Sequence, residues 1–152
     1  MSPYAELCEL AREISILTST ASVLGWDQET YMPERSLEHR ARQLSYLSAK
    51  AHDLATSSRF LSLLEKAELE HSSLSPAQHA NLREWRYETE RAVRIPTVLV
   101  AEESEATTLA KHSWADARKR SDFSQFAPHL ERILKIARKK ADLWGFQDEP
   151  YD

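Results

Sequence analysis

The segment from residue 2 to residue 24 reads SPYAELCELAREISILTSTASVL. Its apolar residues recur at alternating spacings of three and four, at Leu7, Leu10, Ile14, Leu17, Ala21 and Leu24. This spacing lays an apolar seam along one side of an α-helix, and such a seam packs against a long, nearly parallel or antiparallel partner. Ser2 is a favourable N-cap and Pro3 suits the first helical position, so the helix is expected to begin there.

Further segments show helical spacing of the same kind. A second expected helix carries the stripe Leu37, Arg40, Leu44, Leu47, Ala51 and Leu54. A short helical piece follows, with apolar residues at Phe60, Leu61, Leu64 and Ala67. A later helix presents a face that allows close packing because most of its residues are small, at Leu99, Ala106, Ala110, Ser113 and Ala117. The last expected helix repeats the spacing with Ala127, Leu130, Leu134, Ala137, Ala141 and Trp144.

Helix ends are marked by local signals. Ser75-Pro76-Ala77-Gln78 combines an N-cap serine, a proline and a capping-box glutamine, which predicts a sharp helix start after a loop at His71-Ser72-Ser73-Leu74. Asp122 with Gln125 is a second capping signature, and Pro128 is expected to open the main part of the last helix. The remaining expected helix limits are Met32-Pro33, Ile95-Pro96 and Gly145.

Composition supports an all-α fold. The chain has 152 residues and only two glycines, and residues that helices tolerate well dominate it. Its hydrophobic fraction of 41% is slightly low for a globular domain. We expect residues 1–152 to form a single helical domain, an antiparallel bundle-like layer of five or six amphipathic helices. The end at Tyr151-Asp152 lacks a closing element, which suggests either a truncated chain or one that normally continues.

The charge pattern argues against several classes of partner. Twenty basic and 24 acidic residues give a net charge of −4, so no concentrated positive field for nucleic acid is expected. No apolar run approaches the ~20 residues of a membrane span, and no signal peptide is recognisable. The single cysteine, Cys8, excludes an intrachain disulfide and fits a reducing compartment. We therefore expect a cytoplasmic protein that binds neither nucleic acid nor membrane.

The sequence offers no convincing catalytic centre. None of its six histidines is spaced four residues from another, as paired zinc ligands on one helix require. Glu68 and His71 form a Glu-x-x-His unit, but dimetal bundles need that unit twice. Nucleophile motifs are absent, and two glycines, Gly25 and Gly145, cannot build a phosphate-binding loop. We expect neither catalytic residues nor a metal or other cofactor in this chain.

Arg40 is the one charged residue in the stripe of the second expected helix. A guanidinium buried at such a position needs an acceptor, and Asp27 or Glu29 near the end of the preceding helix could supply one. The alternative is that the long side chain reaches water. If Arg40 is paired, the ion pair fastens the first two helices together.

Two clusters stand out as candidate sites. The first is the helix-to-helix turn with Trp26, Asp27, Thr30, Met32 and Pro33, whose tryptophan could simply fill the end of a helix bundle. The second consists of Trp114, Arg118, Asp122 and Phe123. Arg118 and Asp122 are one helical turn apart and could pair at the surface.

At these clusters the sequence resembles the thermostable metallocarboxypeptidases of the carboxypeptidase Taq type. The resemblance begins with Trp26-Asp27-x-x-Thr30-x-Met32-Pro33, Arg40 and Gln43-Leu44. It continues through Asn81, Arg83-Glu84, Ile95-Pro96 and Leu99-Val100. It ends with Trp114-x-x-Ala117-Arg118, Asp122-Phe123, Phe126, Pro128, Leu130 and Tyr151-Asp152. These landmarks span nearly the whole chain.

The resemblance implies a mostly helical, cytoplasmic, homodimeric enzyme that removes C-terminal amino acids from peptides with a divalent metal of the zinc or cobalt type. In that family a His-Glu-x-x-His helix and a downstream glutamate hold the metal, and no residue here corresponds to them. The chain would be the N-terminal helical part that covers the active-site groove, and its partner would be the missing C-terminal catalytic region or a second copy.

The sequence leaves two other functions open. The chain could be a stand-alone helical interaction or dimerisation module derived from that family. It could also be a complete small enzyme that uses its histidines, although their spacing argues against this. An isolated part of a larger enzyme should expose a contiguous apolar patch, whereas an evolved module should close its core or have one symmetric interface.

Overall fold

The computed structural model describes residues 2–70 and 74–150, and every regular element in these two ranges is helical. The elements are α1 (Pro3–Thr30), a 3-10 helix η1 (Glu34–Ser36), α2 (Leu37–Ala55), α3 (Ser58–Leu69), α4 (Pro76–Ala92), α5 (Thr97–Arg120) and α6 (Phe123–Trp144). The expectation of an all-α fold is confirmed for this part of the chain. Most of the expected loop at His71-Ser72-Ser73-Leu74 lies outside the described residues.

The helix starts agree with the local signals. The Ser2 hydroxyl accepts a hydrogen bond from the amide of Ala5 and caps α1, with Pro3 in the first turn. At α4 the Ser75 and Gln78 side chains form the reciprocal capping box. Asp122 caps α6, which therefore begins at Phe123, so the expectation that Pro128 opens the main part of this helix is wrong.

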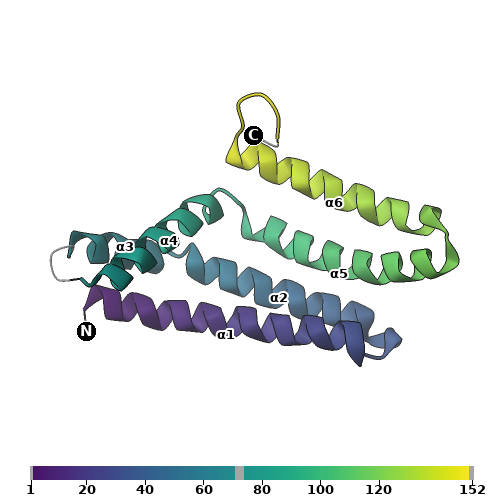
Figure 1. Cartoon of the computed structure of the whole chain (residues 1–152), viewed down its shortest axis with the longest axis horizontal. Coiled ribbons are helices and arrows are strands. Elements are labelled where there is room, and N and C mark those ends of the chain that lie inside the picture. The colour runs from purple at the N-terminus through teal and green to yellow at the C-terminus, as the bar shows by residue number, and fades with distance from the viewer. Residues whose placement is uncertain (1, 71–73, 151–152) are drawn as a thin grey trace.

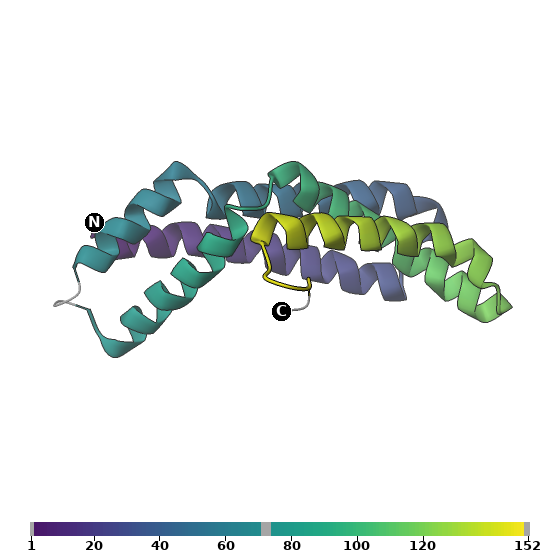
Figure 2. The ribbon, with the colours of Figure 1, turned by 90° about the horizontal axis from the view of Figure 1, so that it is seen from above.

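Four helices form the main layer. In Figure 1 α1, α2, α5 and α6 lie side by side in this order, each antiparallel to the next, and contacts join α1 to α2, α2 to α5 and α5 to α6. Figure 2 shows the layer from above, with α3 and α4 at the end of the molecule where α1 begins. The arrangement is the expected bundle-like layer, in which α6 packs mainly on α5 and lies at one edge.

Buried side chains form two clusters. One joins α1, α3 and α4 and contains Leu7, Leu10, Phe60, Leu63, Leu64, Ala67 and Leu82. The other joins α5 and α6 and contains Ile95, Leu99, Ala106 and Ile136. Burial of one large aliphatic side chain contributes about 1.5–3 kcal/mol. The first cluster is therefore the main apolar stabilisation of α1, α3 and α4, and the second is that of α5 and α6.

Small residues pack the middle of the layer. The face expected on α5 is buried, at Leu99, Ala106, Ala110, Ser113 and Ala117. This face packs against α6, because Ala106 shares a cluster with Ile136 and the Ser113 hydroxyl donates to the carbonyl oxygen of Gln125 at 3.2 Å. The opposite side of α5 contacts α2 through polar groups. The Ser45 hydroxyl donates to the carbonyl oxygen of Ala101 at 2.9 Å, and the hydroxyls of Ser48 and Ser104 lie 3.1 Å apart.

The stripe on α6 is not the buried side of that helix. Its fully buried residue is Ile136, which contacts the α5 cluster, whereas Leu134 in the stripe is 44% exposed. These two residues are two positions apart and therefore point to nearly opposite sides of the helix. The helix thus has two apolar sides, and α5 covers the one that spacing alone does not identify.

Candidate functional site

The first candidate cluster lies where α1 ends and α2 begins, and an ion pair is at its centre. Nη2 of Arg40 lies 2.5 Å from Oδ2 of Asp27, and the Arg40 side chain is 11% exposed. Its Nη1 donates to the carbonyl oxygen of Leu24, and its Nε donates to Oε1 of Gln43 at 3.1 Å. The expected pairing of Arg40 is confirmed, with Asp27 as the acceptor. Each guanidinium nitrogen has an acceptor, which is the condition for burying this charge.

Two exposed aromatic side chains, Trp26 and Tyr31, lie in the same turn as this pair. Trp26 is 59% exposed, and its ring meets that of Tyr31 edge-on with centroids 5.6 Å apart. The alternative that Trp26 fills the end of the bundle is therefore wrong. The Thr30 hydroxyl donates to the carbonyl oxygen of Trp26 at 2.8 Å, and the amide of Met32 donates to the backbone carbonyl oxygen of Asp27 at 2.9 Å. The turn holds an aromatic pair at the surface.

The second cluster lies where α5 ends and α6 begins. The Arg118 guanidinium stands over the ring of Trp114 at 5.4 Å, within the range of a cation–π contact. The rings of Phe123 and Phe126 meet edge-on at 6.3 Å. Together with neighbouring residues these side chains line a depression of about 360 Å³. Aromatic and arginine side chains of this kind are enriched at the centres of protein interfaces.

Asp122 has a structural role in this cluster. Its Oδ1 accepts hydrogen bonds from the amide of Ser124 at 3.1 Å and from the Ser124 hydroxyl at 2.5 Å. The hydroxyl hydrogen bond is the main reason that the pKa of Asp122 is lowered from its ordinary value. The expected surface pair between Asp122 and Arg118 is wrong in the described structure, because Asp122 caps α6 and Arg118 lies over Trp114.

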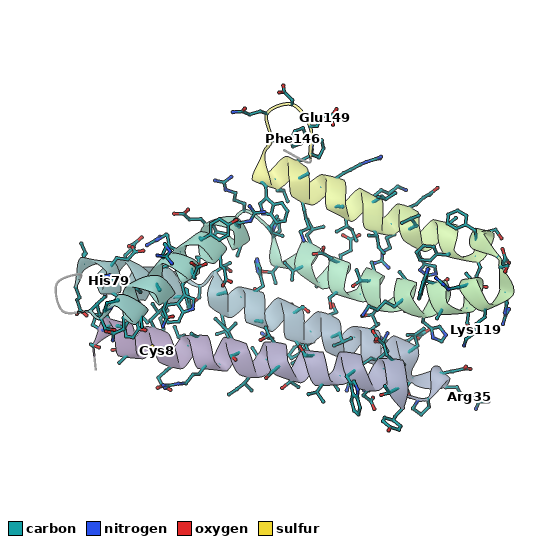
Figure 3. All side chains as sticks on the ribbon, viewed as in Figure 1. Cys8, Arg35, His79, Lys119, Phe146 and Glu149 are labelled. Atoms are coloured by element: carbon teal, nitrogen blue, oxygen red, sulfur yellow. The ribbon has the colours of Figure 1, made fainter. Side chains whose placement is uncertain are left out.

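The two clusters share one end of the layer. Nε2 of Gln28 donates to the carbonyl oxygen of Thr108 at 3.3 Å, and Nζ of Lys111 lies 2.7 Å from Oε1 of Glu29. The hydrogen bond from Lys111 lowers the pKa of the Glu29 carboxyl. These contacts tie the last turns of α1 to α5. In Figure 3 the labels of Arg35 and Lys119 mark this end.

The contacts of Gln28, Glu29 and Lys111 are not evident from the sequence. Glu29 and Lys111 are 82 positions apart, and neither breaks a local pattern. A depression of about 370 Å³ beside Trp114 is lined by both residues. In the sequence these two residues are marked only by their closeness to motif residues. Glu29 comes two positions after Asp27, and Lys111 comes three positions before Trp114.

The described residues offer no donor set for a metal ion. No three His, Cys, Asp or Glu side chains within these ranges are grouped so that they could hold one. Glu68 forms a two-point ion pair with Arg86, at 2.9 and 2.5 Å, and this hydrogen bonding raises the pKa of Arg86. Both ring nitrogens of His52 contact oxygens, one on Thr97 at 3.0 Å and one on Ala92 at 3.1 Å. The donors present therefore do not fit a catalytic metal.

Comparison with known proteins identifies the family of this chain. A family model for metallopeptidases matches residues 6–152. The chain belongs to the carboxypeptidase Taq (M32) metallopeptidase family. This confirms the resemblance drawn from the motif residues.

Individual relatives show how much of such a protein this chain represents. Thermostable carboxypeptidase 1 of Thermus thermophilus is 38% identical over 143 residues, which are 92% of this chain and 28% of the relative. A solved structure described as BsuCP superposes with a TM-score of 0.95 at 27% identity, covering 99% of this chain and 30% of that one. The carboxypeptidase of Pyrococcus furiosus superposes with a TM-score of 0.74 at 31% identity, again over 30% of its chain. The chain spans less than a third of these relatives.

Proposed function

We propose that this chain is the N-terminal helical layer of a metal-dependent carboxypeptidase that removes C-terminal amino acids from peptides. One observation carries the proposal: the family match extends over residues 6–152 but corresponds to only 28% of the Thermus thermophilus relative. The catalytic metal, of the zinc or cobalt type, would be held by the part of the relatives' length that this chain does not cover.

In this proposal the layer forms part of the wall that covers the active-site groove. Its thinness and its exposed aromatic residues support that role, because an isolated layer leaves apolar side chains without contacts. The motif residues of the two clusters would shape this wall, and none would be a catalytic residue. The set comprises Trp26, Asp27, Thr30, Met32, Pro33, Arg40, Trp114, Arg118, Asp122 and Phe123.

Three finer points belong to the same proposal. Residues 1–152 would act as one helical domain, the complete protein would be a cytoplasmic homodimer, and peptides would be bound only when the catalytic region is present. The charge balance and single cysteine support the cellular location. None of the helices in the described ranges has both the length and the apolar character needed to cross a membrane.

The test begins with the source DNA beyond the codon for Asp152. We expect the reading frame to continue and to encode a His-Glu-x-x-His helix. The extended protein should then release the C-terminal amino acid from an N-blocked dipeptide when supplied with zinc or cobalt, and a chelator should abolish the release. The 152-residue chain alone, measured in parallel under the same conditions, should release none.

Two results would overturn the proposal. One is a stop codon directly after Asp152, and the other is an extended, folded protein that releases no amino acid with any divalent metal. Either result would favour the stand-alone interaction module. The exposed aromatic residues of the two clusters would then be its contact surface, and size-exclusion chromatography with light scattering would show whether it dimerises.

A further inference from the structure

Seven residues form a continuous stripe along the whole of α6, and we call this stripe the α6 seam. Its members follow alternating spacings of four and three, at Phe123, Ala127, Leu130, Leu134, Ala137, Ala141 and Trp144. The helix has 22 residues, so the seam is about 33 Å long. A seam of this spacing and length is typical of a helix that packs against another helix along its full length.

Among the described residues no helix packs along the length of the α6 seam, although Trp144 at its end packs against the cluster of α5 and α6. None of its members is buried, and Phe123, Leu134 and Ala137 are exposed. The equivalent seam on α1 is buried where α3 packs on it, at Leu7 and Leu10. The difference follows from position, because α6 lies at the edge of the layer and uses the side carrying Ile136 to contact α5 (Figure 1).

Side chains at both ends of the seam have contacts. At its beginning Phe123 meets Phe126 edge-on and lines the depression that also contains Trp114 and Arg118. At its end the Trp144 indole donates to the carbonyl oxygen of Arg91 at 3.1 Å, and the Arg91 guanidinium stands 4.6 Å from the Trp144 ring. The hydrogen bond and the cation–π contact order Trp144 before binding, which lowers the entropic cost of docking at this end.

The relatives indicate what covers this surface. This chain corresponds to 30% of the BsuCP chain, yet its helices superpose there with a TM-score of 0.95. In that relative the layer therefore has nearly the same arrangement with the larger part of a carboxypeptidase attached, whereas the Pyrococcus furiosus structure superposes less closely, with a TM-score of 0.74.

We propose that the α6 seam is the docking face for an amphipathic helix in the part of the full-length carboxypeptidase that this chain does not cover. The docked helix runs nearly parallel or antiparallel to α6 and carries its own apolar residues at spacings of three and four. A side chain from it enters the depression beside Trp114 and Phe123. This inference rests on the proposed function and adds to it the surface through which the layer joins the catalytic region.

The test compares two leucines of α6. Leu134 lies in the seam and is 44% exposed, whereas Leu143 lies outside it and is 42% exposed. They are nine residues apart and therefore on opposite sides of the helix. Leu134→Glu and Leu143→Glu are made in the 152-residue chain and in the protein encoded by the extended reading frame. Melting temperature and sedimentation are measured for each.

In the isolated chain the two variants should melt within about 1 °C of each other, because the two leucines are exposed to nearly the same extent. In the extended protein Leu134→Glu should lower the melting temperature by about 4 °C or more, because a carboxylate is forced against apolar side chains. Leu143→Glu should lower it by less than half as much. Peptidase activity of the unchanged extended protein serves as the test of the proposed function itself.

Three outcomes would contradict the docking face, and they differ in what they mean for the proposed function. Equal melting temperatures for the two variants in an active extended protein would refute the docking face and leave the proposed function standing. An isolated chain that sediments as a dimer, and as a monomer only when Leu134→Glu is present, would show that a second copy occupies the seam. A reading frame that ends at Asp152 would remove the proposed function and this inference together.

Discussion

Among single residues, the buried guanidinium of Arg40 is the most sensitive point of the first cluster. Its three nitrogens contact Asp27, Leu24 and Gln43, and only Asp27 provides a compensating charge. Removal of one partner from a buried pair leaves the other charge uncompensated. Because the Asp27 side chain is 34% exposed, water reduces part of that cost.

Asp27→Asn should therefore lower the free energy of unfolding by about 1–3 kcal/mol, less than the loss for a fully buried pair. Urea unfolding measures this as a lower midpoint with an unchanged slope. The matched control is Glu29→Gln, which removes an acid of similar position whose pair with Lys111 is mostly exposed. An equal loss in both variants would contradict the special role of Asp27.

The lowered pKa of Asp122 makes a prediction about acid stability. A carboxyl whose folded pKa lies below its unfolded value stabilises the protein above the unfolded pKa, and this contribution disappears as pH falls through the folded pKa. Asp122→Asn keeps a capping side chain but cannot ionise. The parent should be more stable than this variant at neutral pH, and the difference should shrink as the solution becomes acidic. A constant difference from pH 7 to pH 3 would contradict this, and urea midpoints at each pH measure it.

At the scale of elements, packing against α5 depends on small residues. Ala110 is 3% exposed and lies on the buried face of α5 that also carries Ala106 and Ser113. A larger side chain at this position would overlap neighbouring atoms. Ala110→Leu should lower the free energy of unfolding by about 1–3 kcal/mol. Ala137→Leu makes the same change at an exposed position of α6 and should be nearly neutral in the isolated chain. Thermal unfolding of both variants checks the prediction, which fails if they destabilise equally.

Features that depend on neighbouring residues can be predicted from this sequence, whereas contacts between distant segments mostly cannot. The starts at Ser2, Ser75 and Asp122 are predictable because each cap is satisfied within three residues. The buried side of α6 cannot be predicted in this way, because the spacing of apolar residues identifies a stripe but does not identify which helix packs on it. The Asp27–Arg40 pair follows from an arginine in an apolar stripe, whereas the Glu29–Lys111 pair joins segments that have no local relation.

At the scale of the whole molecule, the two apolar clusters share no member. The first holds α1, α3 and α4 together, and the second holds α5 and α6. Between them lie small buried residues such as Ala51 and hydroxyl contacts such as that of Ser48 with Ser104. Fewer large side chains in the middle mean that unfolding at one end transmits weakly to the other.

Leu64→Ala and Ile136→Ala test this division, because each removes a buried side chain from one cluster only. Each should cost about 2–5 kcal/mol where the cavity forms. Native-state hydrogen exchange should show Leu64→Ala accelerating exchange in α1, α3 and α4 while α5 and α6 keep most of their protection, and Ile136→Ala should do the reverse. If both variants accelerate exchange throughout, the chain unfolds as one cooperative unit. Separate responses would mean that α5 and α6 unfold largely independently of α1, α3 and α4.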